Sequence, residues 1–339
     1  MTARFDLSPA ELAERLSDQP RYRTGQVWAG FLRGLEPEEM TDVPRVLRAR
    51  LARDLPPALE LRDRSVSDGG DTVKWLWGLA DGSRVETVLM HYRDRSTVCV
   101  STQAGCAMAC SFCATGQAGF TRHLTAGEIV EQVVRARRAA EPRRLSNVVF
   151  MGMGEPLANY GPVWAAVERL HDDLGLSARH LTVSTVGAVP GIRRLAGERL
   201  PVNLAVSLHA ANDGLRDELV PLNRRYPLAT LMDACAAYVA AKGRRLSFEW
   251  ALIDGVNDRP SDAAELAVVA RPLAAHVNLI PLNPTPGYPV RGTPAAGVRA
   301  FRDQLRDDGV NATVRRNRGT DIDAACGQLA AKALSGPGR

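Results

Sequence analysis

The chain has 339 residues, of which 45% are hydrophobic and 24% charged, a mix typical of a globular protein with one large domain and a smaller one. No apolar run approaches the roughly 20 residues that cross a bilayer, and the first residues lack the basic segment and apolar core of a signal peptide, so we expect a cytoplasmic protein without a membrane span. The net charge of +5 permits a polyanionic partner, but lysine occurs only at positions 74, 242 and 332, and a coding bias toward arginine would give the same excess.

The first part of the chain, residues 1–66, is predicted to be a helical accessory domain. Apolar residues recur there at helical spacing, as in Leu12 and Leu16 and again in Leu47 and Leu51. Eleven arginines in this stretch are balanced by eleven acidic residues, so a dense basic face is not assured.

A linking β-hairpin is predicted for residues 67–95. Two runs rich in β-branched and aromatic residues, Thr72–Leu79 and Arg84–His91, flank the dipeptide Asp81-Gly82. An Asp-Gly between two such runs is a strong hairpin signal.

From residue 96 the pattern changes to strands that alternate with helices, which favours a parallel sheet because parallel neighbours need a crossover. The predicted strands are Thr97–Ser101, Asn147–Met151, Leu181–Thr185, Val202–Leu208, Leu246–Ile253 and Val277–Pro281. The predicted helices are Ala126–Ala140, Gly161–Asp173, Ala229–Ala241, Ser261–Ala274 and Ala295–Asp308. Six β/α units fall short of a closed eight-fold barrel, so we predict an α/β fold with a partial (β/α)6 TIM-like barrel over residues 96–331 and a frayed tail at 332–339. Its site should lie at the carboxyl ends of the strands.

Three closely spaced cysteines, Cys106, Cys110 and Cys113, follow the first predicted barrel strand with the spacing C-x3-C-x2-C. Three thiolates on one loop can hold three irons of a 4Fe–4S cubane and leave the fourth iron open to a small chelating ligand. The amino and carboxylate groups of S-adenosylmethionine (SAM) can supply that chelation, and Phe112 before the last cysteine completes a pattern that resembles the radical SAM superfamily. A structural zinc site with His123 as fourth ligand is the alternative.

Polar residues recur where predicted strands end, so they should face one rim together with the cysteine loop. Gly154 and Glu155 lie in a glycine-rich turn whose backbone could approach a ligand and whose carboxylate could accept from an ammonium group. The other residues of this predicted SAM-binding ring are Ser184, Ser207, Leu208, His209 and Asn283.

The remaining cysteines are distant from the cluster motif in sequence. Cys235 has the spacing of a helix core position, Cys99 lies on the first barrel strand, and Cys326 lies near the C-terminus. Free cysteines are usually small buried hydrophobes, and the residues alone leave that interpretation open for Cys99 and Cys326.

As a set, the motifs resemble the dual-specificity rRNA/tRNA adenine carbon-2 methyltransferase family, over residues 20–331. One departure is His123, where the family pattern has Asn, with no catalytic consequence. The motifs that carry the resemblance are Cys106-x3-Cys110-x-Phe-Cys113, Gly152-Met-Gly-Glu-Pro156, Ser207-Leu-His209, Asn278-Leu-Ile-Pro-Leu-Asn-Pro284 and Ala325-Cys-Gly-Gln-Leu329.

The resemblance implies a mechanism in which one SAM methylates Cys326. A second SAM, cleaved on the cluster, yields a radical that takes a hydrogen from the new S-methyl group. The methylene radical adds to adenine carbon 2, and the residue that matches the base, Glu86, removes the ring proton. Cys99 then attacks the sulfur of Cys326, so that a transient disulfide forms and the methylated base is released.

The resemblance also implies 23S rRNA and tRNA as substrates, with the target adenine of the rRNA in the peptidyl transferase centre, an electron donor such as flavodoxin, and a monomer. Residues 1–66 and the arginines 315, 316 and 318 are candidate RNA contacts. The arginine run at positions 135, 137, 138, 143 and 144 is interpreted as a solvated helix end. Two alternatives stay open: the related carbon-8 rRNA methyltransferase that confers antibiotic resistance, and a zinc-stabilised RNA-binding module without catalysis.

Overall fold

The structure is a computed structural model. It describes residues 2–283, 285, 287–288, 290–315 and 317–330. The predicted tail, the end of the predicted barrel at residue 331 and the candidate RNA contact Arg316 lie outside these residues. Within the described residues no helix is long and apolar enough to span a bilayer.

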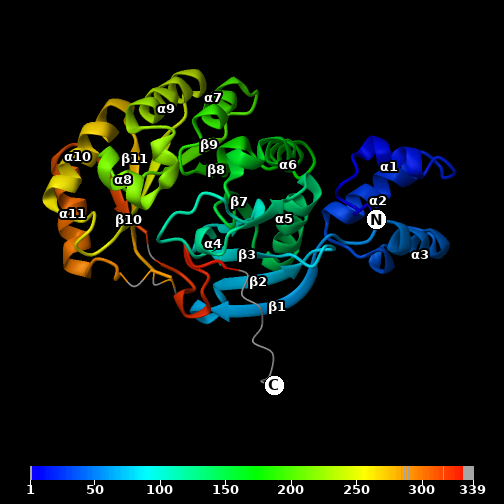
Figure 1. Ribbon diagram of the computed structural model, residues 1–339. Helices are drawn as coiled ribbons and strands as arrows, with labels where there is room; N and C mark the ends of the chain where they lie inside the picture. The colour runs from blue at the N-terminus through cyan, green and yellow to red at the C-terminus, as the bar shows by residue number, and fades with distance from the viewer. Residues whose placement is uncertain (1, 284, 286, 289, 316, 331–339) are drawn as a thin grey trace.

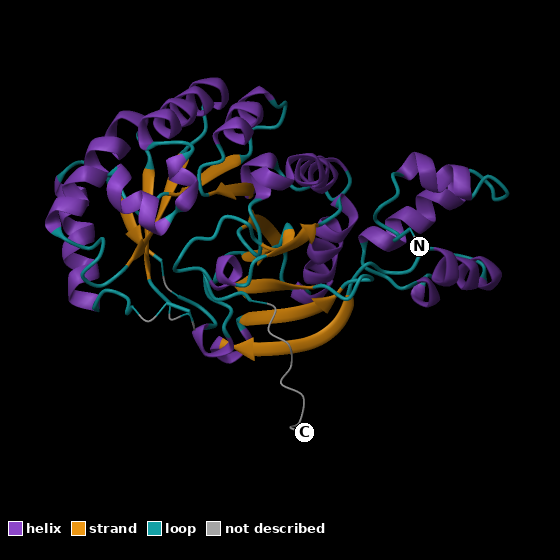
Figure 2. Ribbon diagram, viewed as in Figure 1, coloured by secondary structure: helices purple, strands orange, loops and turns teal. Residues whose placement is uncertain are grey.

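A ten-stranded mixed sheet forms the centre of the molecule (Figures 1 and 2). Its strands, in spatial order, are β1 Glu60–Ser67, β2 Thr72–Gly78, β3 Arg84–His91, β4 Ser96–Cys99, β7 Leu145–Phe150, β8 Leu181–Thr185, β9 Asn203–Ser207, β10 Leu246–Leu252, β11 His276–Pro281 and β12 Asn311–Val314. The first four strands pair antiparallel, and all pairs from β4 to β12 are parallel. The six predicted barrel strands are therefore confirmed, with small shifts of their ends.

Helices follow the parallel strands and cover the outside of the sheet (Figure 2). In the barrel they are α4 Ala114–Gln117, α5 Ala126–Ala140, α6 Tyr160–Asp172, α7 Val189–Gly197, α8 Asp213–Leu219, α9 Leu228–Lys242, α10 Pro260–Ala270 and α11 Ala295–Asp307. Short 3-10 helices occupy Pro37–Glu39, Asp68–Gly70, Pro156–Asn159, Ala178–His180, Pro221–Arg224, Arg271–Leu273 and Thr320–Ile322. Thr125 caps the start of α5, and its side chain forms a capping box with Glu128.

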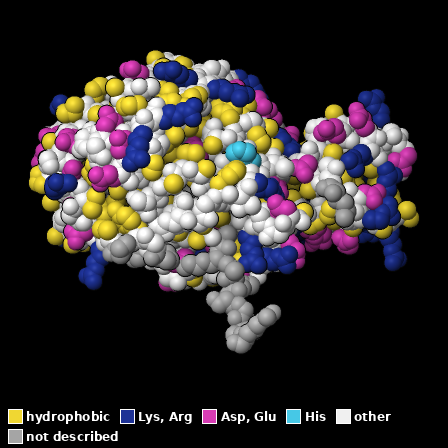
Figure 3. Space-filling model, viewed as in Figure 1, with side chains coloured by type: hydrophobic (Ala, Val, Ile, Leu, Met, Phe, Trp, Pro, Cys, Tyr) yellow, Lys and Arg dark blue, Asp and Glu magenta, His cyan; other side chains and the backbone are white. Residues whose placement is uncertain are grey.

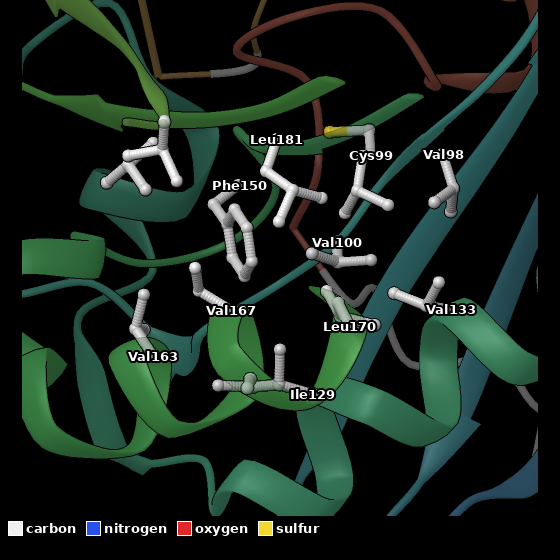
Figure 4. Packing of buried hydrophobic residues seen from close by; sticks show 14 of the residues in the cluster. Val98, Cys99, Val100, Ile129, Val133, Phe150, Val163, Val167, Leu170 and Leu181 are labelled. Carbon is white, nitrogen blue, oxygen red and sulfur yellow. The ribbon is translucent and has the colours of Figure 1, made fainter. Parts of the chain in front are cut away.

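The core lies between the sheet and this helical layer (Figure 4). Ile129 of α5 and Leu170 of α6 are fully buried against it. The same holds for Cys235 of α9, which confirms its predicted place in a helix core. Because consecutive side chains of a strand point to opposite faces, Val98 and Val100 face these helices while the sulfur of Cys99 points away from them (Figure 4).

The N-terminal helices α1 Pro9–Arg15, α2 Tyr22–Leu32 and α3 Arg45–Asp54 form a lobe beside the barrel (Figure 1). Figure 3 shows acidic and basic side chains interspersed on the visible face of this lobe, as the balanced charge count predicts. Arg135 of α5 pairs with Glu36 at 2.8 Å, and Arg138 pairs with Glu39 at 2.5 Å. Both arginine side chains stay partly exposed, at 25% and 39%, so they are solvated as predicted, and they also join the lobe to the barrel.

The prediction that helix continues to residue 66 was also wrong. The last helix of the lobe ends at Asp54, and Glu60–Ser67 forms β1, which pairs antiparallel with β2. β1 lies at the edge of the sheet and is mostly exposed, so its sequence lacks the apolar alternation that marks a strand. The predicted hairpin is consequently a three-stranded antiparallel unit that continues into the barrel sheet through β4.

β1 and β12 are the two ends of the strand order, and the segment after β12 reaches the antiparallel strands (Figure 1). We call residues 318–330, of which all are described, the C-terminal strap. Its Gly319 amide donates to Asp68 at 3.1 Å, Ser67 donates to Asp321, and Lys74 donates to the Asp323 carbonyl at 3.3 Å. The strap therefore connects the strands at the two ends of the sheet.

Candidate active site

A cavity opens at the carboxyl ends of the parallel strands, where the fold class places active sites. Most of the predicted site residues line it: Cys99, Cys106, Cys110, Cys113, Gly154, Glu155, Ser184, Ser207, His209, Asn283 and Cys326. Among the described residues, Glu86 and Leu208 are the predicted site residues that do not line it. The sequence positions are far apart, so only the fold brings them together.

The cysteine loop is closed at its base by a small antiparallel sheet of β5 Gln103–Gly105 and β6 Phe120–His123. The Cys106 amide donates to the Gly119 carbonyl at 2.8 Å, and the Cys113 amide donates to the Cys110 carbonyl at 3.2 Å. These bonds keep the three thiols on one short, turned segment that faces the cavity.

Phe112, next to the last cysteine, anchors the loop to the sheet. Its ring meets the imidazole of His209 edge to face, with centroids 4.6 Å apart and an interplanar angle of 72°. Phe112 also packs in a second apolar cluster that includes Cys110, Val220 and Ile253. The aromatic residue thus holds the cysteine loop over the ends of β9 and β10.

The thiols of this loop lie in a poorly solvated environment. Burial raises the pKa of Cys106 to about 11 and the pKa of Cys110 further, and the neighbouring thiols raise both as well. A bound cation provides the charge that makes such thiols good ligands. Among the described residues, no three His, Cys, Asp or Glu side chains converge on a single metal position, and a cubane takes its thiolates on three separate irons. His123, the candidate fourth zinc ligand, has its Nδ1 3.0 Å from the side-chain amide nitrogen of Gln103, so this ring nitrogen already has a partner.

The glycine-rich turn after β7 packs directly on the backbone that follows β4. Gly154 has φ +99°, and a Cβ there would lie 2.5 Å from the side chain of Gln103. A Cβ on Gly152 would lie 2.7 Å from the Val100 carbonyl. Both positions therefore require glycine, and they hold Glu155 at the cavity wall.

The Glu155 side chain is buried and turned toward the loop after β8. Its two oxygens accept from the Leu157 amide at 3.0 Å and the Val186 amide at 2.9 Å. Burial raises the pKa of Glu155 to about 7, although these hydrogen bonds oppose the shift. A carboxylate in this position is suited to bind a cationic ligand group, whose charge would stabilise its ionised form.

The residues at the end of β9 form the next part of the cavity wall. His209 has φ +61°, and its Nδ1 accepts from the Ala251 amide at 2.9 Å. Burial and the nearby Arg216 lower the pKa of His209 to about 3, so the imidazole is neutral at physiological pH. Leu208 is fully buried and contributes its backbone, since its amide donates to the Glu249 carbonyl at 3.0 Å.

Arg216, which no sequence motif indicated, connects three of these segments. Its guanidinium donates to the Leu208 carbonyl at 3.1 Å, to the Val186 carbonyl at 2.7 Å and to Asn223 Oδ1 at 2.7 Å. The side chain is only 1% exposed, and burial lowers its pKa to about 10. It fixes the loops after β8 and β9 relative to each other.

The strap brings Cys326 to the same cavity as Cys99. Asn283 donates to the Cys326 carbonyl at 3.1 Å, and the Ala114 amide, directly after Cys113, donates to the Gly327 carbonyl at 2.8 Å. Burial raises the pKa of Cys99 to about 12, with Cys326 as a further cause. The two outlying cysteines thus line one cavity together with the cysteine loop.

Arg315 and Glu249 also line the cavity, and sequence reasoning gave neither a role in it. Cys326 is the main cause of a raised Arg315 pKa, with Glu249 contributing as well. Both residues also line a second cavity at the amino ends of the strands. A charged residue within the apolar strand β10 was the available signal for Glu249. The third candidate RNA contact, Arg318, stacks on Tyr92 at 4.6 Å.

Glu86 lies beside the cavity, on β3, and is 4% exposed. Its Oε1 is 2.8 Å from Lys74 Nζ, and its Oε2 accepts from the Ala330 amide of the strap at 2.9 Å. Val88 and Met90, on the same face of β3, line the cavity. Glu86 is thus adjacent to the cavity but covered by the strap.

Comparisons with known proteins agree with this geometry. The model of the radical SAM superfamily matches residues 100–267. The chain is 55% identical to a probable dual-specificity RNA methyltransferase RlmN of Frankia casuarinae, over 95% of this chain and 80% of that protein. It is 51% identical to the protein of the same description from Chloroflexus aurantiacus, over 97% and 92%.

Among solved structures, a radical SAM methyltransferase from Sphaerobacter thermophilus superposes with a TM-score of 0.95 at 52% identity, covering 98% of this chain and all of that one. Such identity over nearly the full length, on a fold whose cavity gathers the cysteine loop and the strand-end residues, decides the family. The chain belongs to the dual-specificity RNA methyltransferase RlmN family of the radical SAM superfamily.

Proposed function

We propose that the chain methylates carbon 2 of an adenine in 23S rRNA and in tRNA, through a methylated cysteine and a transient disulfide. The observation that carries the proposal is that Cys99 and Cys326, far apart in sequence, line one cavity with Cys106, Cys110 and Cys113. The methyl carrier would have to reach the target carbon, and the resolving thiol would have to reach the sulfur of the carrier, so both must lie in one cavity. The relatives' descriptions as dual-specificity RNA methyltransferases support the substrate class.

The cofactors of the superfamily fit the residues of the cavity. Cys106, Cys110 and Cys113 would hold the 4Fe–4S cluster, and Glu155 with Gly154 would hold the amino group of SAM. The remaining predicted SAM contacts are Ser184, Ser207, Leu208, His209 and Asn283. Cluster and SAM together would supply the one-electron chemistry that removes a hydrogen atom from the methyl group on Cys326.

Cys326 would present its methyl group from a strap that two hydrogen bonds hold in place. The side-chain amide of Asn283 donates to the Cys326 carbonyl, and the backbone amide of Ala114 donates to the Gly327 carbonyl. The second bond joins the strap to the residue after the cluster ligand Cys113. This arrangement would keep the methyl group close to the cysteine loop. A displacement of about 1 Å from a reactive position can lower a rate about a hundredfold.

Glu86 and Cys99 would complete the reaction after the methylene carbon has joined the adenine. Glu86 would take the proton from carbon 2, and the unpaired electron left by the addition would return to the cluster. Cys99 would then attack the sulfur of Cys326, so that the carbon–sulfur bond breaks and the methylene carbon takes up a proton to become the methyl group of the released base. The raised pKa of Cys99, about 12, means that the thiol is protonated until it reacts. A disulfide between Cys99 and Cys326 would then be reduced by external thiols.

The alternatives fit the observations less well. The relatives compared above carry the dual-specificity description, so we do not favour the carbon-8 enzyme. A zinc-stabilised module without catalysis leaves the cavity at the strand ends unexplained. We further propose 23S rRNA and tRNA as partners, a flavodoxin-type electron donor, a monomeric enzyme, and RNA contacts by the N-terminal lobe.

Mass mapping of digested rRNA and tRNA tests the proposal. A strain without this gene should lack one methyl group on an adenine of each RNA, and the gene in trans should restore it. Fragmentation of the modified nucleoside should place the methyl on carbon 2. A methyl on carbon 8, or no difference between the strains, would contradict the proposal.

A further inference from the structure

Lys74 and Glu86 form a buried ion pair, and the proposed function gives a role to Glu86 but none to Lys74. Lys74 Nζ lies 2.8 Å from Glu86 Oε1, with the side chains 14% and 5% exposed. Lysine stands at only three positions in a chain that otherwise uses arginine for its positive charge. An ammonium is a compact point charge, whereas a guanidinium needs a planar, two-oxygen partner.

Strand register places this pair on the same face of the sheet as Cys99. Lys74 on β2 is opposite Val88 on β3, and Val88 is opposite Cys99 on β4. Residues opposite each other share a face of the sheet, as do residues two apart on one strand, so Lys74, Glu86, Val88 and Cys99 all project from one face. Val88 and Cys99 line the cavity, and therefore Lys74 and Glu86 lie at its edge.

The strap covers the pair from the other side. The Ala330 amide donates to Glu86 Oε2 at 2.9 Å, and Lys74 Nζ also donates to the Asp323 carbonyl at 3.3 Å. Each carboxylate oxygen thus has a donor of a different kind. Lys74, which binds Oε1, belongs to the sheet, and Ala330, which binds Oε2, belongs to the segment that carries Cys326.

We propose that Lys74 is the positioning residue of Glu86: its ammonium binds Oε1 and so orients the carboxylate at the cavity edge for removal of the adenine proton. In that step the carbon–hydrogen bond of the target carbon breaks, an oxygen–hydrogen bond forms on Glu86, and the electron pair stays with the ring. The inference rests on the role of Glu86 in the proposed function.

The test uses the cluster-loaded enzyme and an RNA substrate with deuterium at the target carbon. In Lys74→Met, turnover should fall on the order of a hundredfold, because the base is no longer aligned. Proton removal then limits the rate, so the deuterium isotope effect on product formation should rise above that of the unmodified chain. Lys74→Arg keeps the positive charge beside Oε1 and should recover part of the rate, but only part, because a guanidinium matches a single carboxylate oxygen poorly. Lys242→Met is the matched control, because Lys242 binds the Glu198 carbonyl at the end of α9, and should behave like the unmodified chain.

The readouts separate this inference from the function on which it rests. Iron content equal to that of the unmodified chain shows that a variant is folded, and Lys74→Gln carries the same prediction should Lys74→Met fail to load. Normal turnover in the Lys74 variants, lost turnover with an unchanged isotope effect, or no recovery in Lys74→Arg would overturn the role of Lys74. Normal turnover in Glu86→Gln would instead overturn the base in the proposed function.

Discussion

Burial sets the chemistry of the reactive side chains. Low solvation raises the pKa of Cys99 to about 12 and of Glu155 to about 7, and lowers the pKa of His209 to about 3. Each shift favours the neutral form, since a charge without water or a partner is costly. The cavity therefore holds acids and bases that become charged when a charged ligand reaches them.

Titration of Glu155 should make the affinity for SAM depend on pH. In the proposed role its carboxylate would have to be ionised to accept the ammonium of SAM, and burial raises its pKa to about 7. We predict that the affinity of the cluster-loaded protein for SAM rises as pH increases through about 7 and levels off above it, measured by equilibrium dialysis. Glu155→Gln should bind weakly at every pH, and an equal affinity of the unmodified chain at pH values on both sides of 7 would count against the assigned role.

Cys99 should be required for release of product and not for its attachment. We predict that Cys99→Ala accumulates a covalent protein–RNA adduct through Cys326, visible on a denaturing gel. Cys235→Ala, which changes a helix-core cysteine, is the matched control and should give no adduct. If Cys99→Ala is recovered free of RNA and turns over normally, Cys99 does not have the proposed role.

The cysteine spacing predicted Cys106, Cys110 and Cys113 at the cavity. The ends of the predicted strands placed Glu155, Ser184, Ser207, His209 and Asn283 there as well. The position of Cys326 beside Cys99 was implied only by family resemblance, because no local pattern connects the two. Arg216 and Lys74 were missed, since an isolated basic residue in a sequence normally indicates a solvated side chain. The partners of Arg216 and Lys74 lie on other elements, so their contacts become visible only in the folded structure.

At the scale of elements, loops at the strand ends are fastened to one another by a few buried polar residues. Arg216 of α8 bonds to the carbonyls of Val186 and Leu208, after β8 and β9. These loops carry the predicted SAM contacts, so their relative position decides the shape of the cofactor site.

We predict that Arg216→Met lowers the free energy of unfolding by roughly 3 kcal/mol, because a buried carbonyl left without a donor costs about 1–3 kcal/mol. Urea unfolding under anaerobic conditions measures this. The control is Arg194→Met, which removes an exposed arginine 3.8 Å from Glu198 and should change the stability by about 0.5 kcal/mol or less. Equal stability of the two variants would show that the three hydrogen bonds of Arg216 contribute little.

The five longer barrel helices and the six barrel strands were predicted because their apolar periodicity is set by the core they cover. The short elements α4, α7, α8, β5 and β6 were not predicted. β1 and β12 were missed, and both are mostly exposed strands at the ends of the sheet. An edge strand pairs through its backbone and buries few side chains, so its sequence carries little pattern. The antiparallel unit therefore has one strand more than the hairpin signal indicated.

On the scale of the whole molecule, the strap unites parts that are far apart in sequence. It starts after β12, contacts β1 and β2, and carries Cys326 over the cluster loop. The sequence indicated a partial barrel and a separate helical segment, but the crossing of the strap could not be read from it, because residues 318–330 have no periodicity of their own. The lobe is fastened by Arg135 and Arg138, which makes it one unit with α5.

The central claim is that three cysteines hold a cluster with an open iron for SAM. Anaerobic reconstitution with iron and sulfide tests it most directly, with iron and sulfide analysis and chromatography of the SAM cleavage product. We predict about four irons per chain and release of 5′-deoxyadenosine on reduction, both lost in a variant with Cys106, Cys110 and Cys113 replaced by alanine. Failure of the unmodified chain to take up iron, or equal loading of the triple variant, would contradict the account.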